Sequence, residues 1–212
     1  MNQIVGPYVI NLDHRADRWE QVQSEFSRVG LSSPIRYSAV YTPGDGATGC
    51  LASHLGAISL DCSGAPLWVC EDDIVFLEDG AVVRGYIEAF LRSDADVLCL
   101  DYNRYKNLEY DSLFYRTVDC QTTSSYIIKS PAAMADLKKL WSEVLVCRQT
   151  HTKHLYERMY KGMRIHNPDF YCADQCWKIL QQRYTFVIPK RRCVYQREGY
   201  SDIEQRVVNY RC

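Results

Sequence analysis

The chain has 212 residues, of which 47% are apolar and 24% are charged, and its formal net charge at pH 7 is -1. This composition is ordinary for a globular chain that forms a single α/β domain over residues 1–212. The small net charge excludes a strong electrostatic attraction to nucleic acid or to an anionic membrane surface. No apolar run reaches the roughly 18 residues of a membrane span, so we expect none.

Residues 1–12 have no basic segment in front of an apolar one, so they do not resemble a secretory signal. We therefore expect a cytoplasmic protein whose ten cysteines are reduced. Cys172 and Cys176, together with His151 and His154, are metal-binding residue types. Their spacing is irregular for zinc, so we do not expect a zinc site.

Residues 8–12 are predicted to form a central strand, and the helix that follows repeats apolar residues at helical spacing up to Gly30. This is the first half of a βαβ unit, in which ligands bind at the carboxyl ends of the strands. Asn11, Arg15 and Arg18 lie at that end, and two arginines on one loop suit the phosphates of a nucleotide. The alternative for each arginine is an Arg–Asp pair on a solvated helix N-terminus.

A second strand is predicted over Ile35–Tyr41, and a turn-rich loop leads from it into a helix over residues 48–58. We expect Ser53 and His54 near the N-terminal end of this helix. Helix N-termini favour anions, so His54 is a candidate to approach a diphosphate. The alternative is that His54 only makes structural hydrogen bonds.

The stretch Leu67–Phe76 is an apolar run that contains three consecutive acids, Glu71, Asp72 and Asp73. Such a run between turn signals predicts a buried strand. An unpaired buried carboxylate costs several kcal/mol or becomes protonated. We therefore expect the three acids to meet a divalent cation and a polar ligand. The alternative is that the strand ends at Cys70 and that the acids cap the following turn.

The rest of the chain alternates predicted strands and helices, which favours an α/β sandwich around a mainly parallel sheet. Arg104–Arg116 has no clear period and is expected to be a loop that forms a wall or lid of the active site. His151–Asn167 is basic and irregular. The further predicted elements are helices over 81–92, from 131 and after 174, strands over 96–100, 122–128 and 185–188, and a last helix after 202.

Five motifs in this order resemble glycosyltransferase family 25, which includes lipooligosaccharide and procollagen galactosyltransferases. The same motifs are similar to virus-encoded glycosyltransferase domains of large algal viruses, for which the host cytoplasm is the expected location. The resemblance implies a GT-A fold, which is a Rossmann-like α/β/α sandwich for nucleotide-diphospho-sugars. The motifs are Val9–Arg18, Gly49-Cys50-x-x-Ser53-His54, Glu71-Asp72-Asp73-Ile74, Ser125-Tyr126-Ile127-Ile128 and Asp174.

The resemblance also implies a UDP-sugar donor and a divalent cation, Mn²⁺ or Mg²⁺. Asp73 would bind the metal, and Glu71 and Asp72 would reach the ribose or the donor sugar. Asn11, Arg15, Arg18 and His54 would surround the nucleotide and its diphosphate. An inverting transfer needs a general base near the acceptor hydroxyl. Asp174 is the first candidate for this base, with a plain helix N-cap as its alternative, and Asp101 is the second.

The expected activity is the transfer of galactose, glucose or rhamnose to a hydroxyl of a glycan or glycoprotein by a monomeric domain. One alternative is a non-catalytic module that binds nucleotide-sugars. Another is a metal-dependent phosphoesterase, against which five scattered histidines argue. The chain ends abruptly at Tyr210-Arg211-Cys212, and we hypothesise that it is one domain of a larger enzyme.

Overall fold

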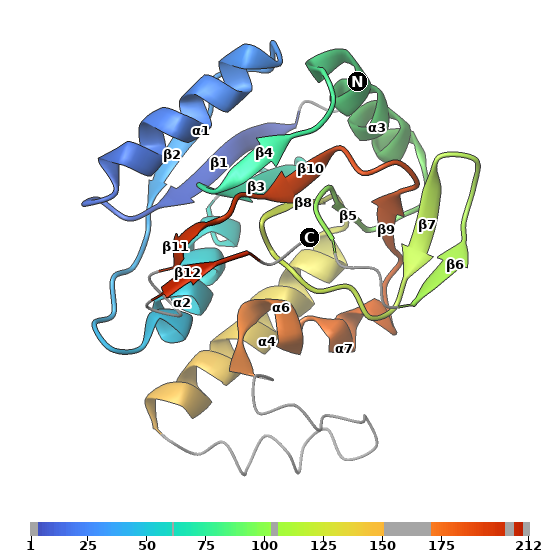
Figure 1. Ribbon diagram of the computed structural model, residues 1–212. Coiled ribbons are helices and arrows are strands. Elements are labelled where there is room, and N and C mark those ends of the chain that lie inside the picture. The colour runs from blue at the N-terminus through green and yellow to red at the C-terminus, as the bar shows by residue number, and fades with distance from the viewer. Residues whose placement is uncertain (1–3, 61, 103–105, 151–170, 202–205, 210–212) are drawn as a thin grey trace.

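A computed structural model of the chain describes residues 4–60, 62–102, 106–150, 171–201 and 206–209. Its centre is an eight-stranded sheet in the order β2-β1-β3-β8-β5-β9-β7-β6 (Figure 1). β8 is antiparallel to β3 and β5, and β7 is antiparallel to β9 and β6, so the other six strands share one direction. The predicted α/β class with a mainly parallel sheet is confirmed. The strands are β1 Val5–Asn11, β2 Ile35–Ser38, β3 Leu67–Glu71, β5 Val97–Cys99, β6 Asn107–Glu109, β7 Phe114–Thr117, β8 Ser125–Ile128 and β9 Phe186–Pro189.

Helices cover both faces of this sheet. Val9 and Trp68 point into one buried apolar cluster, with residues of α1 and α3, whereas Ile10 and Val69 point into another, with residues of α2, α4, α6 and α7. Alternate residues of a strand face opposite sides of its sheet, so the two clusters are the two faces of one three-layer domain. The helices are α1 Ala16–Arg28, α2 Gly46–Ile58, α3 Gly80–Arg92, α4 Pro131–Gln149, α6 Ala173–Cys176 and α7 Lys178–Gln181.

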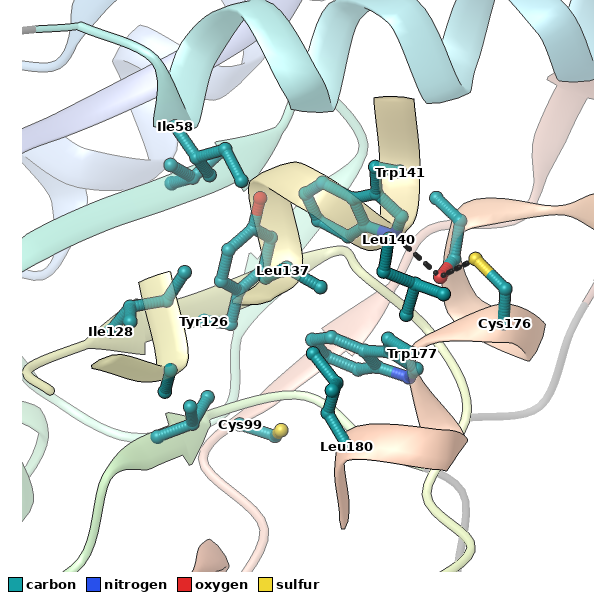
Figure 2. Close-up of a cluster of buried hydrophobic side chains, with 14 of the residues drawn as sticks. Ile58, Cys99, Tyr126, Ile128, Leu137, Leu140, Trp141, Cys176, Trp177 and Leu180 are labelled. Carbon is teal, nitrogen blue, oxygen red and sulfur yellow. Dashed lines mark hydrogen bonds between the residues drawn. The ribbon is translucent and has the colours of Figure 1, made fainter. Parts of the chain in front are cut away.

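The apolar cluster between the sheet and α4 is rich in aromatic residues (Figure 2). Tyr126 of β8, Trp141 of α4 and Trp177 are all fully buried. The indole N–H of Trp141 donates to the carbonyl of Ala173, 3.2 Å away. Because Ala173 begins α6, this hydrogen bond fixes the start of α6 against α4.

The helix starts follow from local capping. Asp79 accepts a hydrogen bond from the Val82 N–H at the start of α3, 3.0 Å away, and Ser130 accepts one from the Ala133 N–H at the start of α4, 3.3 Å away. Side-chain oxygens at these positions satisfy backbone donors that lack a helical partner. Pro131 occupies the first turn of α4, as predicted.

The acidic stretch is not one continuous strand, so the prediction over Leu67–Phe76 is wrong at Asp72 and Asp73. β3 ends at Glu71, and Asp72 and Asp73 form a turn. The chain then continues as β4 Ile74–Phe76, which pairs with β10 Val194–Gln196 in a separate two-stranded sheet. A straight strand would place Glu71 and Asp73 on the same face, whereas the turn gives each acid its own partners.

Two further predictions are corrected by strand pairing. The described part of Arg104–Arg116 contains β6 and the start of β7, a hairpin at the sheet edge opposite β2, rather than a loop. The tail forms the hairpin β11 Gly199–Ser201 and β12 Arg206–Val208, so β12 is a strand where a last helix was predicted after residue 202. An aromatic and a β-branched side chain, Tyr200 and Val207, face each other across this hairpin, a pair that favours strands. The irregular segment His151–Asn167 lies outside the described residues.

None of the helices in the described ranges is long and apolar enough to cross a membrane. No disulfide joins any two of the nine cysteines that the structure describes. The described fold rests on its two apolar clusters.

Gly49 tests how closely α2 packs against the loop after β2, and Gly85 of α3 is the control at an open position. A Cβ on Gly49 would lie 2.5 Å from the Val40 carbonyl oxygen and 2.6 Å from Thr42 Oγ1, whereas a Cβ on Gly85 of α3 meets nothing within 4 Å. We expect Gly49→Ala to lower the free energy of unfolding by about 1–3 kcal/mol because of the clash. Gly85→Ala should raise it by about 0.5–1 kcal/mol through helix propensity. Urea unfolding measures both, and equal stabilisation by the two variants would contradict the close packing at Gly49.

Candidate functional site

A pocket of about 240 Å³ opens at the carboxyl ends of β1 and β3. Its floor includes the acids Glu71, Asp72 and Asp73, and His54 and Cys50 of α2 line one side. The loop after β2 and the C-terminal residues from Gln196 to Ser201 form further walls. This is the edge of the sheet at which α/β folds bind ligands, and the one at which the sequence placed the site.

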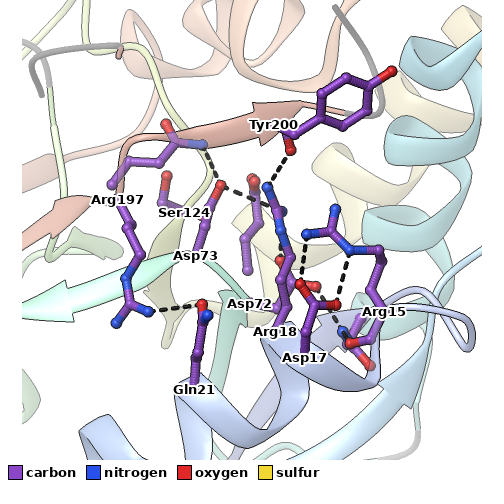
Figure 3. Close-up of polar contacts among 12 residues, drawn as sticks. Arg15, Asp17, Arg18, Gln21, Asp72, Asp73, Ser124, Arg197 and Tyr200 are labelled. Carbon is purple, nitrogen blue, oxygen red and sulfur yellow. Dashed lines mark hydrogen bonds and ion pairs between the residues drawn. The ribbon is translucent and has the colours of Figure 1, made fainter. Parts of the chain in front are cut away.

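Asp72 is held by two residues that were predicted to belong to the site (Figure 3). The side-chain amide of Asn11 donates to Asp72 Oδ2 at 2.7 Å, and the guanidinium of Arg18 donates to Oδ1 at 2.9 Å. Asn11 is itself buried and accepts a hydrogen bond from Arg36 Nε at 2.8 Å. Burial raises the pKa of the Asp72 carboxyl, and the charge of Arg18 opposes that rise. Both carboxylate oxygens of Asp72 therefore already accept hydrogen bonds from other residues of the protein.

The two predicted arginines have different surroundings. Arg18 lines the pocket and also donates to the carbonyl of Tyr200 at 2.6 Å. Arg15 lies outside the pocket lining and forms a two-pronged pair with Asp17, with distances of 3.0 and 2.9 Å. This pair lowers the pKa of Asp17 to about 2. The structure thus shows the Arg–Asp pair foreseen as the alternative for Arg15, whereas Arg18 faces the acids.

Among the described residues, the carboxylate of Asp73 accepts fewer hydrogen bonds than those of Glu71 and Asp72. Its Oδ2 accepts a hydrogen bond from the Gln196 amide at 3.0 Å, but its buried Oδ1 has no hydrogen-bond partner among the described residues. Burial and the charges of Glu71 and Asp72 raise the pKa of Asp73 to about 8, although Arg18 lies 3.8 Å away. A buried carboxylate oxygen without a partner, beside two further acids, fits a hard divalent cation such as Mn²⁺ or Mg²⁺.

Glu71 is held by His54, which lies deeper in the fold than predicted. His54 is in the second half of α2 and fully buried, so the anion-binding argument for a helix N-terminus does not apply to it. Its Nε2 lies 3.2 Å from Glu71 Oε1, and its Nδ1 lies 3.0 Å from the hydroxyl oxygen of Tyr126. Burial alone would raise the pKa of Glu71, but the interactions with His54, Thr123 and Arg18 together outweigh it, so the pKa is lowered.

A second set of possible metal ligands overlaps this pair. The ligand atoms of Cys50, His54 and Glu71 all lie within 4.8 Å of one another. Burial raises the pKa of the Cys50 thiol well above its ordinary value, whereas a metal binds the thiolate. Both ring nitrogens of His54 also have hydrogen-bond partners already. Asp73 therefore offers the better match to a cation.

The two predicted bases lie outside the residues that line the pocket. Asp174 is in the first turn of α6, whose N-cap is Cys172, so the N-cap expected at Asp174 is not found. Its carboxylate accepts hydrogen bonds from the Thr122 N–H at 3.3 Å and the Gln175 amide at 3.1 Å, and burial raises its pKa. Asp101 is fully buried, and burial raises its pKa to about 6 despite Arg192 at 3.6 Å.

Several residues of the site carry no sequence signal. Gln196 contacts Asp73 from a position 123 residues later in the chain, and the Arg197 N–H donates to the Asp73 carbonyl at 2.7 Å. The hydroxyl of Thr123 donates to Glu71 at 2.8 Å. Gln196 and Arg197 were placed in the tail before the predicted last helix, and no local pattern indicated their contacts with Asp73. The polar run at 122–125, placed in a buried strand, was the one available hint of Thr123.

No protein-family model matches the chain, and no curated protein sequence matches it either. Among solved structures, the crystal structure of A197 from STIV is similar with a TM-score of 0.40 and 14% identity, over 98% of this chain and 93% of that chain. A proposed glucose-1-phosphate thymidylyltransferase from Bacillus anthracis, in complex with a sucrose, gives a TM-score of 0.42 and 10% identity. That match covers 89% of this chain and 69% of the other. These likenesses are too distant to assign a function.

The burial of Asp101 predicts how the stability of the fold depends on pH. Its pKa is raised from 3.8 to about 6, so the folded state binds this proton more tightly than the unfolded state. The resulting stability is complete below pH 4 and is lost as the pH rises through 6. A difference of about two pKa units corresponds to about 3 kcal/mol.

We therefore expect the free energy of unfolding of the natural protein to fall by about 3 kcal/mol relative to Asp101→Asn between pH 4 and pH 7. Urea titrations across this range measure the difference. Parallel pH profiles for the two proteins would contradict the raised pKa.

Proposed function

We propose that this protein is a metal-dependent glycosyltransferase with a GT-A fold that resembles glycosyltransferase family 25. It transfers galactose, glucose or rhamnose from a UDP-sugar to a hydroxyl of a glycan or glycoprotein, with inversion. The observation that carries the proposal is the buried Oδ1 of Asp73, which has no hydrogen-bond partner among the residues that the structure describes. It belongs to a pocket residue in the turn after β3, beside two more acids and Arg18.

Different residues of the chain have different proposed roles at this site. Asp73 would hold the cation, and Asn11 and Arg18 keep Asp72 in place beside it. A divalent cation bound there would supply Lewis-acid assistance to the departure of the diphosphate. Arg18 adds a fixed positive charge at the pocket wall, where the negative charge of the leaving group develops.

Asp174 is the proposed general base, and Asp101 is the second candidate. The pKa of each carboxyl is raised by burial, and a base works best with a pKa near the operating pH. Neither acid lines the pocket, and this observation favours the second candidate function, a module that binds nucleotide-sugars without turnover.

Metal-dependent nucleotide binding tests the proposal through Asp73. We expect UDP to bind at least tenfold more tightly with manganese than without it, because the cation links Asp73 to the diphosphate. Asp73→Asn removes the charge with little change of shape and should abolish this manganese effect. Glu88→Gln, an exposed acid on α3, is the matched control and should leave it intact. Isothermal titration calorimetry measures all three proteins, and UDP binding that is indifferent to manganese in the natural protein would refute the metal site.

Donor hydrolysis separates an enzyme from a binding module. With manganese present, we expect slow release of free UDP from one member of a panel of UDP-galactose, UDP-glucose and UDP-rhamnose. Asp174→Asn should slow glycosyl transfer to an acceptor by 10²–10⁴-fold, the usual contribution of a general base. Chromatographic measurement of UDP follows both. Tight binding of a donor without any release of UDP would support the module instead.

A further inference from the structure

The imidazole of His54 is clamped inside the fold. It is fully buried, and the ring centroids of Tyr126 and Trp141 lie 5.7 and 5.8 Å from its own. Each ring nitrogen faces one polar atom, Tyr126 Oη at 3.0 Å and Glu71 Oε1 at 3.2 Å. The ring cannot turn without losing packing and both hydrogen bonds, so its orientation is fixed.

The direction of these hydrogen bonds follows from Glu71, because an ionised carboxylate only accepts. Nε2 of His54 therefore carries the hydrogen that faces Glu71. In the neutral imidazole Nδ1 is then an acceptor, and the hydroxyl of Tyr126 donates to it. A chain of donors thus runs from Tyr126 in the apolar cluster, through His54, to Glu71 in the pocket.

The two oxygens of Glu71 have different roles. Oε1 accepts from His54 Nε2 and, at 2.8 Å, from the Thr123 hydroxyl. Oε2 has no hydrogen bond to any described residue, and 21% of the side chain is exposed where it lines the pocket. Asp72 differs, since Asn11 and Arg18 occupy both of its oxygens. Of the three acids, Glu71 is therefore the one presented to a ligand as a pre-oriented hydrogen-bond acceptor.

We propose that Tyr126 and His54 are positioning residues that hold Glu71 as the acceptor for a hydroxyl group of the bound nucleotide-sugar. This inference rests on the proposed function and assigns the recognition of hydroxyls to Glu71 rather than to Asp72. A site built to pair with a hydroxyl discriminates strongly against ligands that lack it. The hydroxyl belongs to the ribose or to the transferred sugar, which share this chemistry.

Three manganese complexes on the full chain distinguish these sources, namely pyrophosphate without hydroxyls, UDP with the ribose hydroxyls, and UDP-galactose with both sets. In Tyr126→Phe, which frees His54 to shift, we expect pyrophosphate to bind within twofold of its normal affinity. UDP-galactose should bind about tenfold more weakly, as for a misaligned hydrogen bond to a charged group. An equal loss for UDP assigns the hydroxyl to the ribose, and an unchanged UDP affinity assigns it to the transferred sugar.

Thr123→Val removes the second donor to Oε1 without touching His54, and it should reproduce this selectivity. It also decides the question if Tyr126→Phe does not fold. Tyr184→Phe is the matched control, since it removes a hydroxyl that donates to Asp136 at 2.7 Å, away from the pocket, and all three affinities should stay normal.

The inference is overturned if Tyr126→Phe and Thr123→Val bind the three ligands like the natural protein, or lose affinity for all three equally. A natural protein that binds none of the manganese complexes is a distinct result. It overturns the proposed function itself, and this inference with it.

Discussion

Three adjacent carboxylates at the end of one buried strand are the constraint on which the site depends. Like charges at this spacing cannot share one apolar environment, and the chain separates them by turning at Asp72 and Asp73. Glu71 then faces His54 and Thr123, and Asp72 faces Asn11 and Arg18. Asp73 accepts one hydrogen bond, from the neutral amide of Gln196, and the guanidinium of Arg18 lies 3.8 Å from it. The protein thus satisfies two of the acids with its own groups and leaves Asp73 Oδ1 without a hydrogen-bond partner among the described residues, which is the basis of the proposed cation site.

The same acids attach the C-terminal segment to the sheet. Arg18 bridges Asp72 and the carbonyl of Tyr200, 182 residues further along the chain. The Arg197 N–H donates to the backbone of Asp73. The wall formed by β10 and β11 is therefore fixed by groups that also face the pocket. One guanidinium, that of Arg18, therefore contacts both the acids and this wall.

The sequence was informative where local periodicity and tertiary structure agree. β1, α1, α3 and the start of α4 at Pro131 were predicted, and the convergence of Asn11, Arg18 and the acids followed from strand ends meeting at one sheet edge. The break at Asp72 was missed because Ile74–Phe76 is as apolar as a continued strand. The contacts of His54 were not predictable, since they depend on β8 running antiparallel beside β3. Gln196 was missed because a side-chain contact between residues 123 positions apart leaves no local pattern.

The central claim is that Asp73 binds a cation jointly with a nucleotide diphosphate. A crystal structure of the protein with MnCl₂ and UDP, measured for the anomalous scattering of manganese, tests it most directly. The account predicts one strong anomalous peak within coordination distance of Asp73 Oδ1 and of the diphosphate oxygens. A peak between Cys50, His54 and Glu71, or bound UDP without manganese at Asp73, would contradict it.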